Sequence, residues 1–310
     1  MNAMILAAGF GTRLLPHTNR LPKPLFPVLG KTLLQTAIET ALSFNPGRIV
    51  VNTHHLGGLI EDWLSSRDFG VEIILSHEES ILGTAGGIKN AQRWLSGGDF
   101  AVINSDIIAD MDWAALENFH KDKGAVATLA LRPNPDTSKY GPLCVNGGGK
   151  VVRYVKTTGP GYKDDLEKYM FTGLSVLSPA IFEKMPAGKV ADISSEVYAP
   201  MTSKGEGLCG MVTNSRWIDV GTAQDYYSVV MDSLKANGGS IIHPPLPDST
   251  KMIEPVYVEK GAIIGENCVI GPCASIHAGA VVGDGCAVKN CVVLPGSILE
   301  KGTLVSEGIV

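Results

Sequence analysis

The chain has 310 residues, a formal net charge of −5, 45% hydrophobic residues and 18% charged residues. This composition is ordinary for a globular protein with a sizeable core, and the length predicts about two domains. The acidic balance offers no broad basic surface, which argues against a nucleic-acid partner. No apolar run reaches the ~18 residues of a membrane span, and the N-terminus lacks the pattern of a signal peptide. We therefore expect a cytoplasmic protein that binds neither nucleic acid nor membrane.

The first hundred residues alternate short apolar runs with longer amphipathic segments. Residues 3–8 form an apolar run that ends at Gly9, and residues 32–44 carry apolar side chains at helical spacing. These patterns predict a buried strand and then a helix. The same reasoning predicts strands at 48–52, 71–75 and 100–104, and helices at 56–66 and 87–95. The alternation predicts an α/β fold with a Rossmann-like, mostly parallel sheet flanked by helices.

Ligands of such sheets bind beyond the carboxyl ends of the strands. The loops that follow Ala8, Asn52, Leu75 and Ser105 are therefore the expected places for chemistry. Further along, the patterns predict strands at 125–131, 151–155 and 207–213, and helices at 179–185, 193–203 and 222–236. A glycine pair and a proline-rich segment then predict a linker. We expect a catalytic domain at 1–237, a linker at 238–255 and a second domain at 256–310.

Aliphatic residues recur at every sixth position of the C-terminal segment. They are Val258, Ile264, Ile270, Ile276, Val282, Val288 and Leu294. This period resembles the hexapeptide repeat of left-handed parallel β-helices, in which stacked coils bury a continuous core. These seven repeats correspond to slightly more than two coils. So short a β-helix leaves an exposed end, and we expect a homo-oligomer that forms through it.

The cysteines of the repeat follow the same spacing. Cys268 and Cys286 are eighteen residues apart, as are Cys273 and Cys291, which predicts that each pair stacks in neighbouring coils. The chain has no CxxC pair, so neither a zinc ribbon nor a thioredoxin-type motif is predicted, and we expect reduced thiols. His277 is the only histidine of the repeat, and we expect it at the surface or in a subunit contact.

A glycine-rich turn, Ala8-Gly9-Phe10-Gly11, follows the first predicted strand directly. Such a turn lets backbone N–H groups approach a phosphate chain closely. It lacks the third glycine of a dinucleotide fingerprint and the Gly-Lys-Ser/Thr of a P-loop. It is followed instead by two cations, Arg13 and Lys23, at positions suited to flank a triphosphate.

The string LAAGFGTRLLPHT, with PKPLFPV at 22–28, resembles the signature of the sugar-1-phosphate nucleotidylyltransferases. Residues 82–88, 102–107, 171–174 and 217–222 resemble further segments of that family, and a hexapeptide tail is a common family appendage. The resemblance implies an enzyme that transfers a nucleotidyl group from a nucleoside triphosphate to a sugar 1-phosphate. It also implies Mg²⁺ as the cofactor.

The resemblance implies a role for each matched position. Arg13, Lys23, Asp106 and Asp219 are the expected catalytic residues, and the two aspartates are the expected Mg²⁺ ligands. The expected sugar-phosphate-binding residues are Gly141, Lys156 and Gly173. The expected nucleotide-binding residues are Leu6, Ala7, Ala8, Gly9, Gly11, Thr12, Arg13, Lys23, Gly83, Thr84, Ala85, Gly86 and Asn104.

Two positions depart from the family pattern. Ser105 replaces the usual glycine before the metal-binding aspartate. Val155-Lys156-Thr157 stands where the family often has Glu-Lys-Pro, so a common contact to a sugar hydroxyl is missing and the identity of the sugar stays open.

His54 and His55 follow the second predicted strand, where we expect a structural or lid role, with substrate contact as the alternative. Their surroundings resemble bacterial mannose-1-phosphate guanylyltransferases and the related N-acetylmuramate-1-phosphate uridylyltransferases.

The residue types suggest how the reaction proceeds. An oxygen of the sugar phosphate attacks the α-phosphorus in line, and pyrophosphate leaves. A phosphate monoester has a second pKa of about 6, so the nucleophile is already an anion and needs no general base. Catalysis is then positioning plus charge stabilisation. We expect Arg13 to contact the leaving pyrophosphate, Lys23 the α-phosphate, and Lys156 the sugar phosphate.

Several substrate pairs and functions stay open at this point. GTP with mannose 1-phosphate is the first choice, because the LGTAGG loop and the hexapeptide tail favour that branch. Uridylyl or thymidylyl transfer to a glucose- or N-acetylmuramate-type sugar 1-phosphate is the alternative, and cytidylyl transfer to a non-sugar phosphate such as phosphocholine is another. A regulatory subunit with the same fold is argued against by the retained cations and aspartates. An acyltransferase tail is argued against by its short length.

Overall fold

The computed structural model describes residues 1–134 and 136–310. The chain forms two compact units. The first comprises Met1–Phe10 and Leu34–Ile218, and the second comprises Gly11–Leu33 and Asp219–Val310. Residues 11–33 thus belong with the C-terminal part of the chain, although they follow the first strand directly. Among the helices of the described residues, none is both long and apolar enough to cross a membrane.

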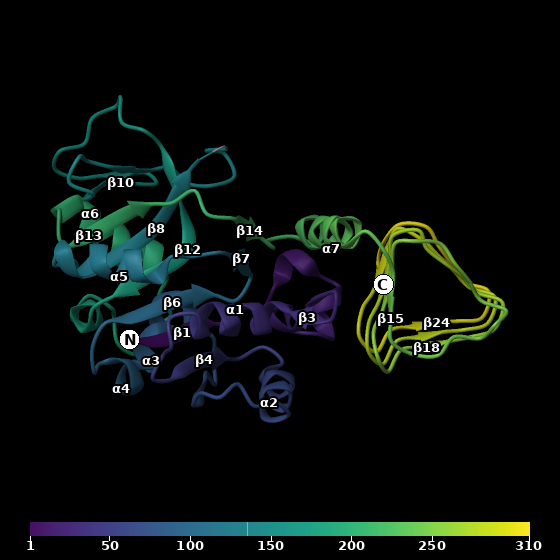
Figure 1. Cartoon of the computed structure of the whole chain (residues 1–310). Coiled ribbons are helices and arrows are strands. Elements are labelled where there is room, and N and C mark those ends of the chain that lie inside the picture. The colour runs from purple at the N-terminus through teal and green to yellow at the C-terminus, as the bar shows by residue number, and fades with distance from the viewer. Residues whose placement is uncertain (135) are drawn as a thin grey trace. The chain divides into compact units, whose positions relative to one another are not determined.

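The first unit contains a mixed sheet with parallel strands at its centre (Figure 1). Its strands are β1 (Asn2–Leu6), β4 (Ile49–Thr53), β5 (Ile73–His77), β6 (Phe100–Asn104), β8 (Ala127–Pro133), β9 (Leu143–Val145), β10 (Val151–Tyr154), β11 (Thr157–Thr158), β12 (Tyr169–Leu177) and β13 (Leu208–Val212). The order is β11-β10-β9-β12-β6-β1-β4-β5, and β8 pairs with β12 and β13. Strand β1 is parallel to β4 and β6, β4 is parallel to β5, and β12 is antiparallel to β6. The predicted α/β fold with a Rossmann-like parallel core is confirmed.

Helices and short turns cover this sheet. They are α1 (Leu33–Leu42), α2 (Gly57–Ser65), α3 (Gly83–Asn90), α4 (Gln92–Leu95), α5 (Trp113–Asp122), η4 (Pro179–Glu183), η5 (Ser194–Tyr198) and α6 (Ala199–Lys204). Helices α3 and α4 pack on β1, and α5 packs on β8 and β12. Every residue of β4 is buried, as expected for a parallel strand covered on both faces. Asp112 caps α5 by accepting a hydrogen bond from Ala115 N at 2.9 Å.

Several elements differ from their predicted bounds. The strand predicted at 71–75 lies at Ile73–His77, and the helix predicted at 87–95 is divided into α3 and α4. The longest strand, β12, was not predicted, because Gly173 interrupts its apolar pattern and its last six residues are all buried. Two short strands that were not predicted, β7 (Ile107–Ala109) and β14 (Trp217–Asp219), pair with each other in a separate two-stranded sheet.

The second unit begins with three 3-10 turns and a hairpin. The turns are η1 (Thr12–Leu14), η2 (His17–Asn19) and η3 (Lys23–Leu25), and the hairpin pairs β2 (Pro27–Val28) with β3 (Lys31–Thr32). The unit resumes with α7 (Ala223–Asn237), close to the helix predicted at 222–236. A capping box begins α7, because Thr222 and Asp225 each accept a hydrogen bond from the other's backbone N–H.

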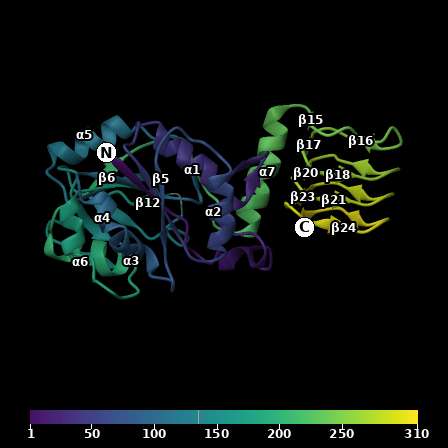
Figure 2. The same ribbon diagram turned by 90° about the horizontal axis from the view of Figure 1, so that it is seen from below.

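The rest of the second unit is a parallel β-helix, which has a triangular outline in Figure 1 and stacked coils in Figure 2. One face is β15 (Ile241–Ile242), β17 (Val256–Val258), β20 (Ala274–Ile276), β23 (Cys291–Val293) and β26 (Gly308–Ile309). The others are β16 (Lys251–Met252), β19 (Val269–Ile270), β22 (Ala287–Val288) and β25 (Leu304–Val305), and β18 (Ile263–Ile264), β21 (Val281–Val282) and β24 (Ile298–Leu299). Strands β15 and β16 lie within 238–255, so the segment expected to be a linker carries the first coil.

The interior of the β-helix contains the aliphatic residues of the six-residue period. From Val258 to Val288 each predicted position is buried, with at most 8% exposed. The period then breaks, because Ile276 lies opposite Val293 and not opposite Leu294. Three residues separate β19 from β20, whereas only two separate β22 from β23. The coil from β20 to β23 is therefore one residue shorter than the coil from β17 to β20.

This shorter coil decides which cysteines stack. Val269 lies opposite Ala287, so the preceding residues Cys268 and Cys286 are stacked as predicted. Ala274 lies opposite Cys291, so the predicted stacking of Cys273 on Cys291 is wrong by one residue. All six cysteines are free thiols.

The expectation that His277 lies at the surface or in a subunit contact is also wrong. Its side chain is 0% exposed. His277 Nδ1 lies 2.9 Å from Glu259 Oε2, and Nε2 lies 3.0 Å from Ser275 Oγ. The ring of Tyr257 packs against the imidazole with centroids 5.6 Å apart. Neighbouring coils supply both the carboxylate and the covering ring, which a linear repeat does not reveal.

Candidate active site

The carboxyl ends of three parallel strands meet at one edge of the sheet. Leu6, the last residue of β1, lies opposite Asn52 of β4 and Asn104 of β6. The chain runs from β1 to β4 and β5 on one side and then returns to β6 on the other. Such a reversal opens a crevice beside the first strand, and ligands of this fold class bind there. The glycine-rich turn follows β1, and Asp106 follows β6.

The glycine-rich turn is anchored at its start and open at its centre. Asn52 Oδ1 accepts a hydrogen bond from Ala7 N at 2.8 Å, and Ala8 is buried. Gly9 is exposed, and a Cβ at this position would meet no atom within 4 Å. The backbone at Gly9 is thus open to an incoming group. This arrangement agrees with the predicted approach of a phosphate chain.

The next part of the motif lies in the second unit and is held by its own contacts. Gly11 has φ +63°, and a Cβ there would lie 2.9 Å from a Thr18 methyl and 3.2 Å from Lys23 Cβ. Gly11 O accepts hydrogen bonds from Thr18 Oγ1 at 3.1 Å and from Leu14 N at 2.9 Å. Only glycine fits both this left-handed conformation and the close packing. The motif thereby brings Gly11 and Lys23 together, while Thr12 and Arg13 are exposed.

Arg13 and Asp219 approach the same point of the second unit. A Cβ at Gly221 would lie 3.0 Å from Arg13 Nη1 and 3.1 Å from Asp219 Oδ2. Asp219 ends β14, and Gly221 directly precedes the capping box of α7. Tertiary structure therefore joins an expected pyrophosphate-binding cation and an expected metal ligand that are more than two hundred positions apart in sequence.

Asn104 and Gly173 lie side by side in the first unit. Ile103 of β6 pairs with Leu174 of β12, and a Cβ at Gly173 would lie 2.8 Å from Asn104 Nδ2. An expected nucleotide-binding residue therefore contacts an expected sugar-binding residue. Asp106 is half-buried two residues after the end of β6. Ser105 N donates to Leu6 O at 3.2 Å, so the serine that replaces glycine is accommodated beside the end of β1.

The loop expected to hold the nucleobase and ribose makes close contacts of its own. Ala191 O accepts hydrogen bonds from Ala85 N at 2.9 Å and Gly86 N at 3.3 Å. Thr84 Oγ1 donates to Asp192 Oδ2 at 3.1 Å, and a Cβ at Gly83 would lie 2.5 Å from Ala191 O. The four positions Gly83, Thr84, Ala85 and Gly86 therefore fit against 191–192. Sequence reasoning did not include that segment in the site.

A buried polar network beneath this loop was also missed. Glu78 and Asn52 are 1% and 3% exposed, and Asn52 Nδ2 donates to Glu78 Oε1 at 2.7 Å. Glu78 Oε2 accepts from Leu82 N at 2.8 Å, while Asn52 Oδ1 holds Ala7 N. One carboxylate and one amide thus join the glycine-rich turn to the 82–86 loop. The signal in the sequence was weak, because Glu78 sits in the polar string SHEES.

The two histidines after β4 differ in their contacts. His54 Nδ1 lies 2.8 Å from Glu78 O, which commits that nitrogen to the backbone. Phe10 of the glycine-rich turn packs edge-on against His54, with centroids 5.4 Å apart, and against His55 at 5.5 Å. These contacts agree with the expected structural role. They also place an aromatic side chain, 45% exposed, beside Gly9.

The expected sugar side of the first unit contains a residue in an unusual conformation. Val155 has φ +54°, which is rare for a β-branched residue. Pro142 O accepts from Val155 N at 2.8 Å, and a Cβ at Gly141 would lie 2.7 Å from Val155 Cγ2. Val155 thus places methyl groups against Gly141 where the family often has a carboxylate. The next residue, Lys156, is exposed.

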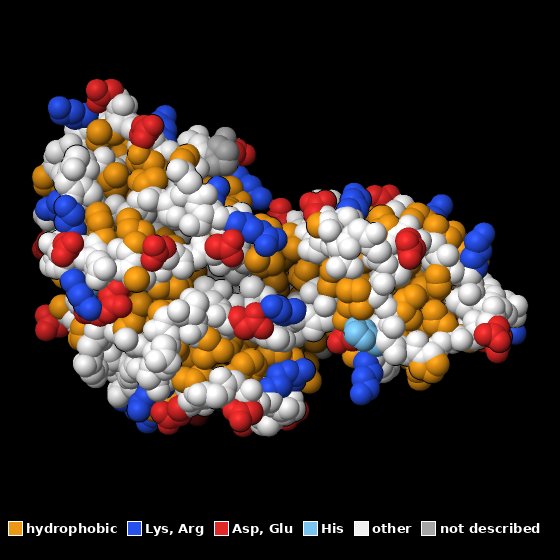
Figure 3. Space-filling view, in the orientation of Figure 1, with side chains coloured by type: hydrophobic (Ala, Val, Ile, Leu, Met, Phe, Trp, Pro, Cys, Tyr) orange, Lys and Arg blue, Asp and Glu red, His pale blue; other side chains and the backbone are white. Residues whose placement is uncertain are grey.

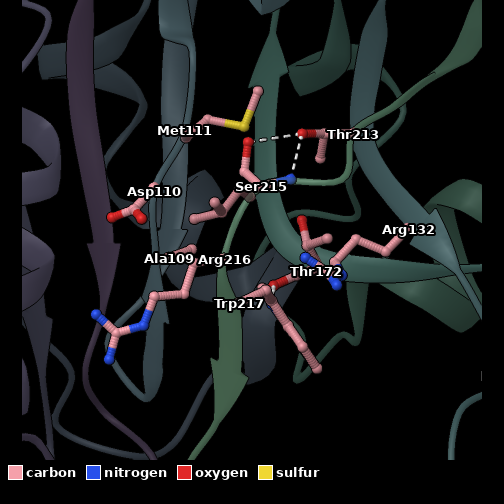
Figure 4. A pocket seen from close by; sticks show the side chains of 10 residues that line it. Ala109, Asp110, Met111, Arg132, Thr172, Thr213, Ser215, Arg216 and Trp217 are labelled. Atoms are coloured by element: carbon pink, nitrogen blue, oxygen red, sulfur yellow. Dashed lines mark hydrogen bonds between the residues drawn. The ribbon is translucent and has the colours of Figure 1, made fainter. Parts of the chain in front are cut away.

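A small pocket of the first unit is lined by Arg132, Thr172 and Trp217, among others (Figure 4). Trp217 Nε1 donates to Thr172 O at 2.8 Å, and Arg132 extends toward the same place. One Arg132 guanidinium nitrogen is buried without a hydrogen-bond partner. The cavity has room for roughly one water molecule, so it is too small to hold a sugar.

The side chains expected to bind a metal suit Mg²⁺ better than a metal ion that is coordinated entirely by protein side chains. Among the described residues, no three or more His, Cys, Asp or Glu side chains are grouped closely enough to hold a metal ion. Mg²⁺ in phosphate-transferring enzymes is commonly bound by one or two carboxylates together with substrate phosphates and water. Asp106 follows β6 in the first unit and Asp219 ends β14, and each is a carboxylate of the kind that such sites use.

The fold and the local geometry define a class of protein. A parallel sheet with a glycine-rich turn at its reversal point, followed by two cations and a β-helix, is the organisation of a nucleotide-handling transferase. Two family models support this class of protein. Residues 2–236 match the nucleotidyl transferase model, and residues 252–310 match the GMPPB C-terminal domain model. The chain belongs to the nucleotidyl transferase family and is an enzyme of the sugar-1-phosphate nucleotidylyltransferase type.

Named relatives cover the whole chain. It is 31% identical over 321 residues to probable mannose-1-phosphate guanylyltransferase 1 of Oryza sativa subsp. japonica, covering 100% of this chain and 86% of the relative. It is 28% identical over 345 residues to a UTP–glucose-1-phosphate uridylyltransferase of Synechocystis, covering 100% and 87%. The crystal structure of HddC from Yersinia pseudotuberculosis is similar with a TM-score of 0.62 and 25% identity, covering 74% of this chain and 98% of HddC.

The buried network yields a stability prediction. Glu78→Gln leaves only one acceptor oxygen where two oxygens now accept hydrogen bonds, so one buried donor is opposed by an amide NH₂. We expect a loss of about 1–3 kcal/mol in unfolding free energy, measured by urea denaturation. Glu79→Gln is the matched control, because Glu79 is exposed. Equal stability of the two variants would contradict the role of Glu78.

Proposed function

We propose that the enzyme transfers a guanylyl group from GTP to mannose 1-phosphate, giving GDP-mannose and pyrophosphate. The observation that carries the proposal is the glycine-rich turn, with Gly9 open and with Lys23 packed on Gly11. The relatives named as mannose-1-phosphate guanylyltransferases support this pair of substrates, since they match over the full chain. The β-helix that follows the catalytic domain supports the same branch.

In the proposed reaction an oxygen of the sugar phosphate bonds to the α-phosphorus, and the bond to the bridging oxygen of the pyrophosphate breaks. The monoester is largely ionised near pH 7, because its second pKa is about 6. The residues therefore have to bring anions together and neutralise them. Lys23 neutralises the α-phosphate, Arg13 stabilises the charge on the departing pyrophosphate, and Lys156 binds the incoming phosphate. Backbone N–H groups at Gly9 and Gly11 complement the phosphate chain.

Asp106 and Asp219 are the residues we propose to hold Mg²⁺. The ion, when bound, supplies positive charge to phosphate oxygens and helps to align them. The two carboxylates supply oxygen ligands of the kind that a hard cation prefers. Arg13 approaches the same glycine as Asp219, which supports a shared role near the phosphates.

Uridylyl transfer to glucose 1-phosphate is the second candidate. The relative from Synechocystis favours it, since that protein carries this activity in its name and also matches the full chain. A regulatory subunit is disfavoured by the retained Arg13, Lys23, Asp106 and Asp219. Acyl transfer by the β-helix is disfavoured because His277 is buried and both ring nitrogens have partners.

We also propose that a second copy of the chain covers one face of the β-helix. Ile263 and Ile298 are 61% and 65% exposed, and both align with Val281 across the strands β18, β21 and β24. Stacked aliphatic side chains of this kind are costly to leave in water. Hydrophobic side chains are visible among the charged ones on the β-helix in Figure 3.

We propose that the protein is cytoplasmic. The free thiols support this location, because the cytoplasm is reducing.

The substrate proposal predicts the outcome of a pyrophosphate-release screen. Each of the four nucleoside triphosphates is combined with a panel of sugar 1-phosphates and magnesium. We expect GTP with mannose 1-phosphate to give the highest kcat/KM. Faster release with UTP and glucose 1-phosphate would favour the second candidate, and no magnesium-dependent release from any pair would refute the enzyme assignment.

The metal-ligand role predicts a large kinetic effect of Asp106→Asn. Loss of one metal-binding carboxylate should lower kcat about 10²–10³-fold or more, as removal of a charge-stabilising group does in other enzymes. Asp110→Asn is the matched control, because Asp110 is an exposed aspartate four residues further along. We expect near-normal kcat for Asp110→Asn. Near-normal kcat in Asp106→Asn, with an unchanged circular-dichroism spectrum, would reject the role.

The proposed subunit contact predicts that a charge on this face lowers the mass of the assembled protein. Ile298→Lys places a charge at one end of the aliphatic row of Ile263, Val281 and Ile298, so we expect light scattering to show a smaller species than the wild type. Ser306→Lys introduces the same charge at an exposed position between β25 and β26 and should leave the mass unchanged. A monomeric wild type at micromolar concentration would contradict the proposed contact.

A further inference from the structure

The segment that carries Arg13 and Lys23 belongs to the same compact unit as the β-helix. In sequence this segment is part of the nucleotidyl transferase match, whereas the β-helix matches a different model. The contacts between the two parts therefore raise the question of what the β-helix does for the segment. Two sets of contacts hold the stretch that follows Lys23, and a third set lies away from it.

The first set joins α7 to the residues directly after Lys23. Phe26 N donates to Lys23 O at 3.0 Å, so the turn at Lys23 continues into Phe26 and Pro27. Tyr226 Oη donates to Pro27 O at 2.6 Å, and its ring packs edge-on against Phe26 with centroids 5.1 Å apart. Tyr226 is 0% exposed, and burial raises its pKa well above its usual value, so the hydroxyl keeps the proton that it donates.

The second set joins the β-helix to the tip of the hairpin. Leu29 and Gly30 form the turn between β2 and β3, with φ +47° and +83°. Two positive φ values are the mark of a tight two-residue hairpin loop. A Cβ at Gly30 would overlap Tyr257 Oη and lie 3.8 Å from the carboxyl carbon of Glu259. The hairpin tip is thus pressed onto a tyrosine of β17.

The surface under the hairpin tip is itself held by a buried network. Glu259 Oε2 lies 2.9 Å from His277 Nδ1 and accepts from Ala278 N at 3.3 Å. The Tyr257 ring rests on the His277 imidazole, which in turn meets Ser275 Oγ at 3.0 Å. Adjacent coils therefore fix the two side chains that face Gly30.

A third set of contacts lies further along the segment and along α7. Arg20 Nη2 donates to Gly296 O at 3.2 Å, and Tyr227 Oη donates to Asn290 O at 2.9 Å. Helix α7 contacts both β2 of the hairpin and β26 of the final coil. These contacts link α7 and the segment to corners of the β-helix without touching Lys23 or the hairpin tip.

We infer that α7 and the β-helix position the phosphate-binding segment, with Tyr226 and Tyr257 as positioning residues for Lys23. Tyr226 holds the backbone that follows Lys23, and Tyr257 holds the hairpin that continues it. The β-helix therefore serves catalysis within its own chain, separately from any contact between subunits. The kinetic part of this inference rests on the proposed nucleotidyl transfer.

The first test removes one hydroxyl. Tyr226→Phe loses the hydrogen bond to Pro27 O but keeps the ring contact with Phe26. Displaced Lys23 loses contacts that matter most in the transition state, so we expect kcat to fall about tenfold or more with little change in either KM. Tyr227→Phe is the matched control, since it removes a hydroxyl from the neighbouring residue and its bond to Asn290 O. Its kcat should stay within about twofold of wild type.

The second test changes the contact between the hairpin tip and Tyr257. Gly30→Ala creates a clash with Tyr257, and Gly285→Ala is its control, because Gly285 has φ +68° but a Cβ there meets nothing within 4 Å. Both variants carry a strained backbone, yet only Gly30→Ala should lower kcat. The double variant Gly30→Ala with Tyr257→Phe removes the clashing oxygen and should recover part of the loss.

A third measurement does not depend on activity. Hydrogen exchange of amides 23–33 should be faster in Tyr226→Phe and Gly30→Ala than in wild type, and unchanged in the two controls. Unaltered exchange in this segment, or wild-type kcat in both variants, would overturn the inference. If the wild-type enzyme released no pyrophosphate with any pair, the proposed function would fail, and faster exchange would still support the positioning role.

Discussion

Parallel pairing of β1 with β4 and β6 places Leu6 opposite both Asn52 and Asn104, and the first unit's part of the expected site is arranged around that register. Because side chains alternate along strands, a shift of one residue would exchange the side chains that face the two covering layers and would move the loops along the edge. The glycine-rich turn begins where β1 ends, and Asp106 follows where β6 ends. The position of these two elements is therefore a consequence of strand pairing.

Buried polar groups then hold the loops at this edge. Asn52 binds the backbone of Ala7 and the carboxylate of Glu78, and Glu78 binds the backbone of Leu82. A buried carboxylate without partners would be very costly, so each of these hydrogen bonds matters for stability. Glu78 thus serves as an acceptor for two donors within the fold. The exposed cations Arg13 and Lys156 are left for phosphate chemistry in the proposed reaction.

In the second unit, the β-helix provides the contacts that hold a loop-rich segment in place. Its coils bury an aliphatic core, and the outward Tyr257 meets the hairpin that follows Lys23. Tyr226 of α7 holds the same stretch from its backbone. A catalytic segment that includes three short 3-10 turns has little regular hydrogen bonding of its own, so external contacts define its geometry.

Periodicity explains which elements were predictable. The helix at Leu33–Leu42 and the strand at Phe100–Asn104 have clear spacing and clear stop signals, and both lie close to the predicted bounds. Strand β12 gives no such signal, because it is buried on both faces over most of its length and contains Gly173. The misplaced Cys273–Cys291 pair arose from a corner that is one residue shorter, which a strict period of eighteen cannot reveal.

The sequence by itself determined the class of fold, the family and the residues that carry charge in the proposed reaction. Those features depend on local patterns: a strand followed by a glycine-rich turn, a six-residue repeat, and a motif of fixed spacing. Only the tertiary structure decided that Glu78 links two loops, that His277 is buried, and that Tyr226 and Tyr257 hold the segment of Lys23. Each of these is a contact between residues far apart in the chain, and such contacts depend on register and packing that no local pattern encodes.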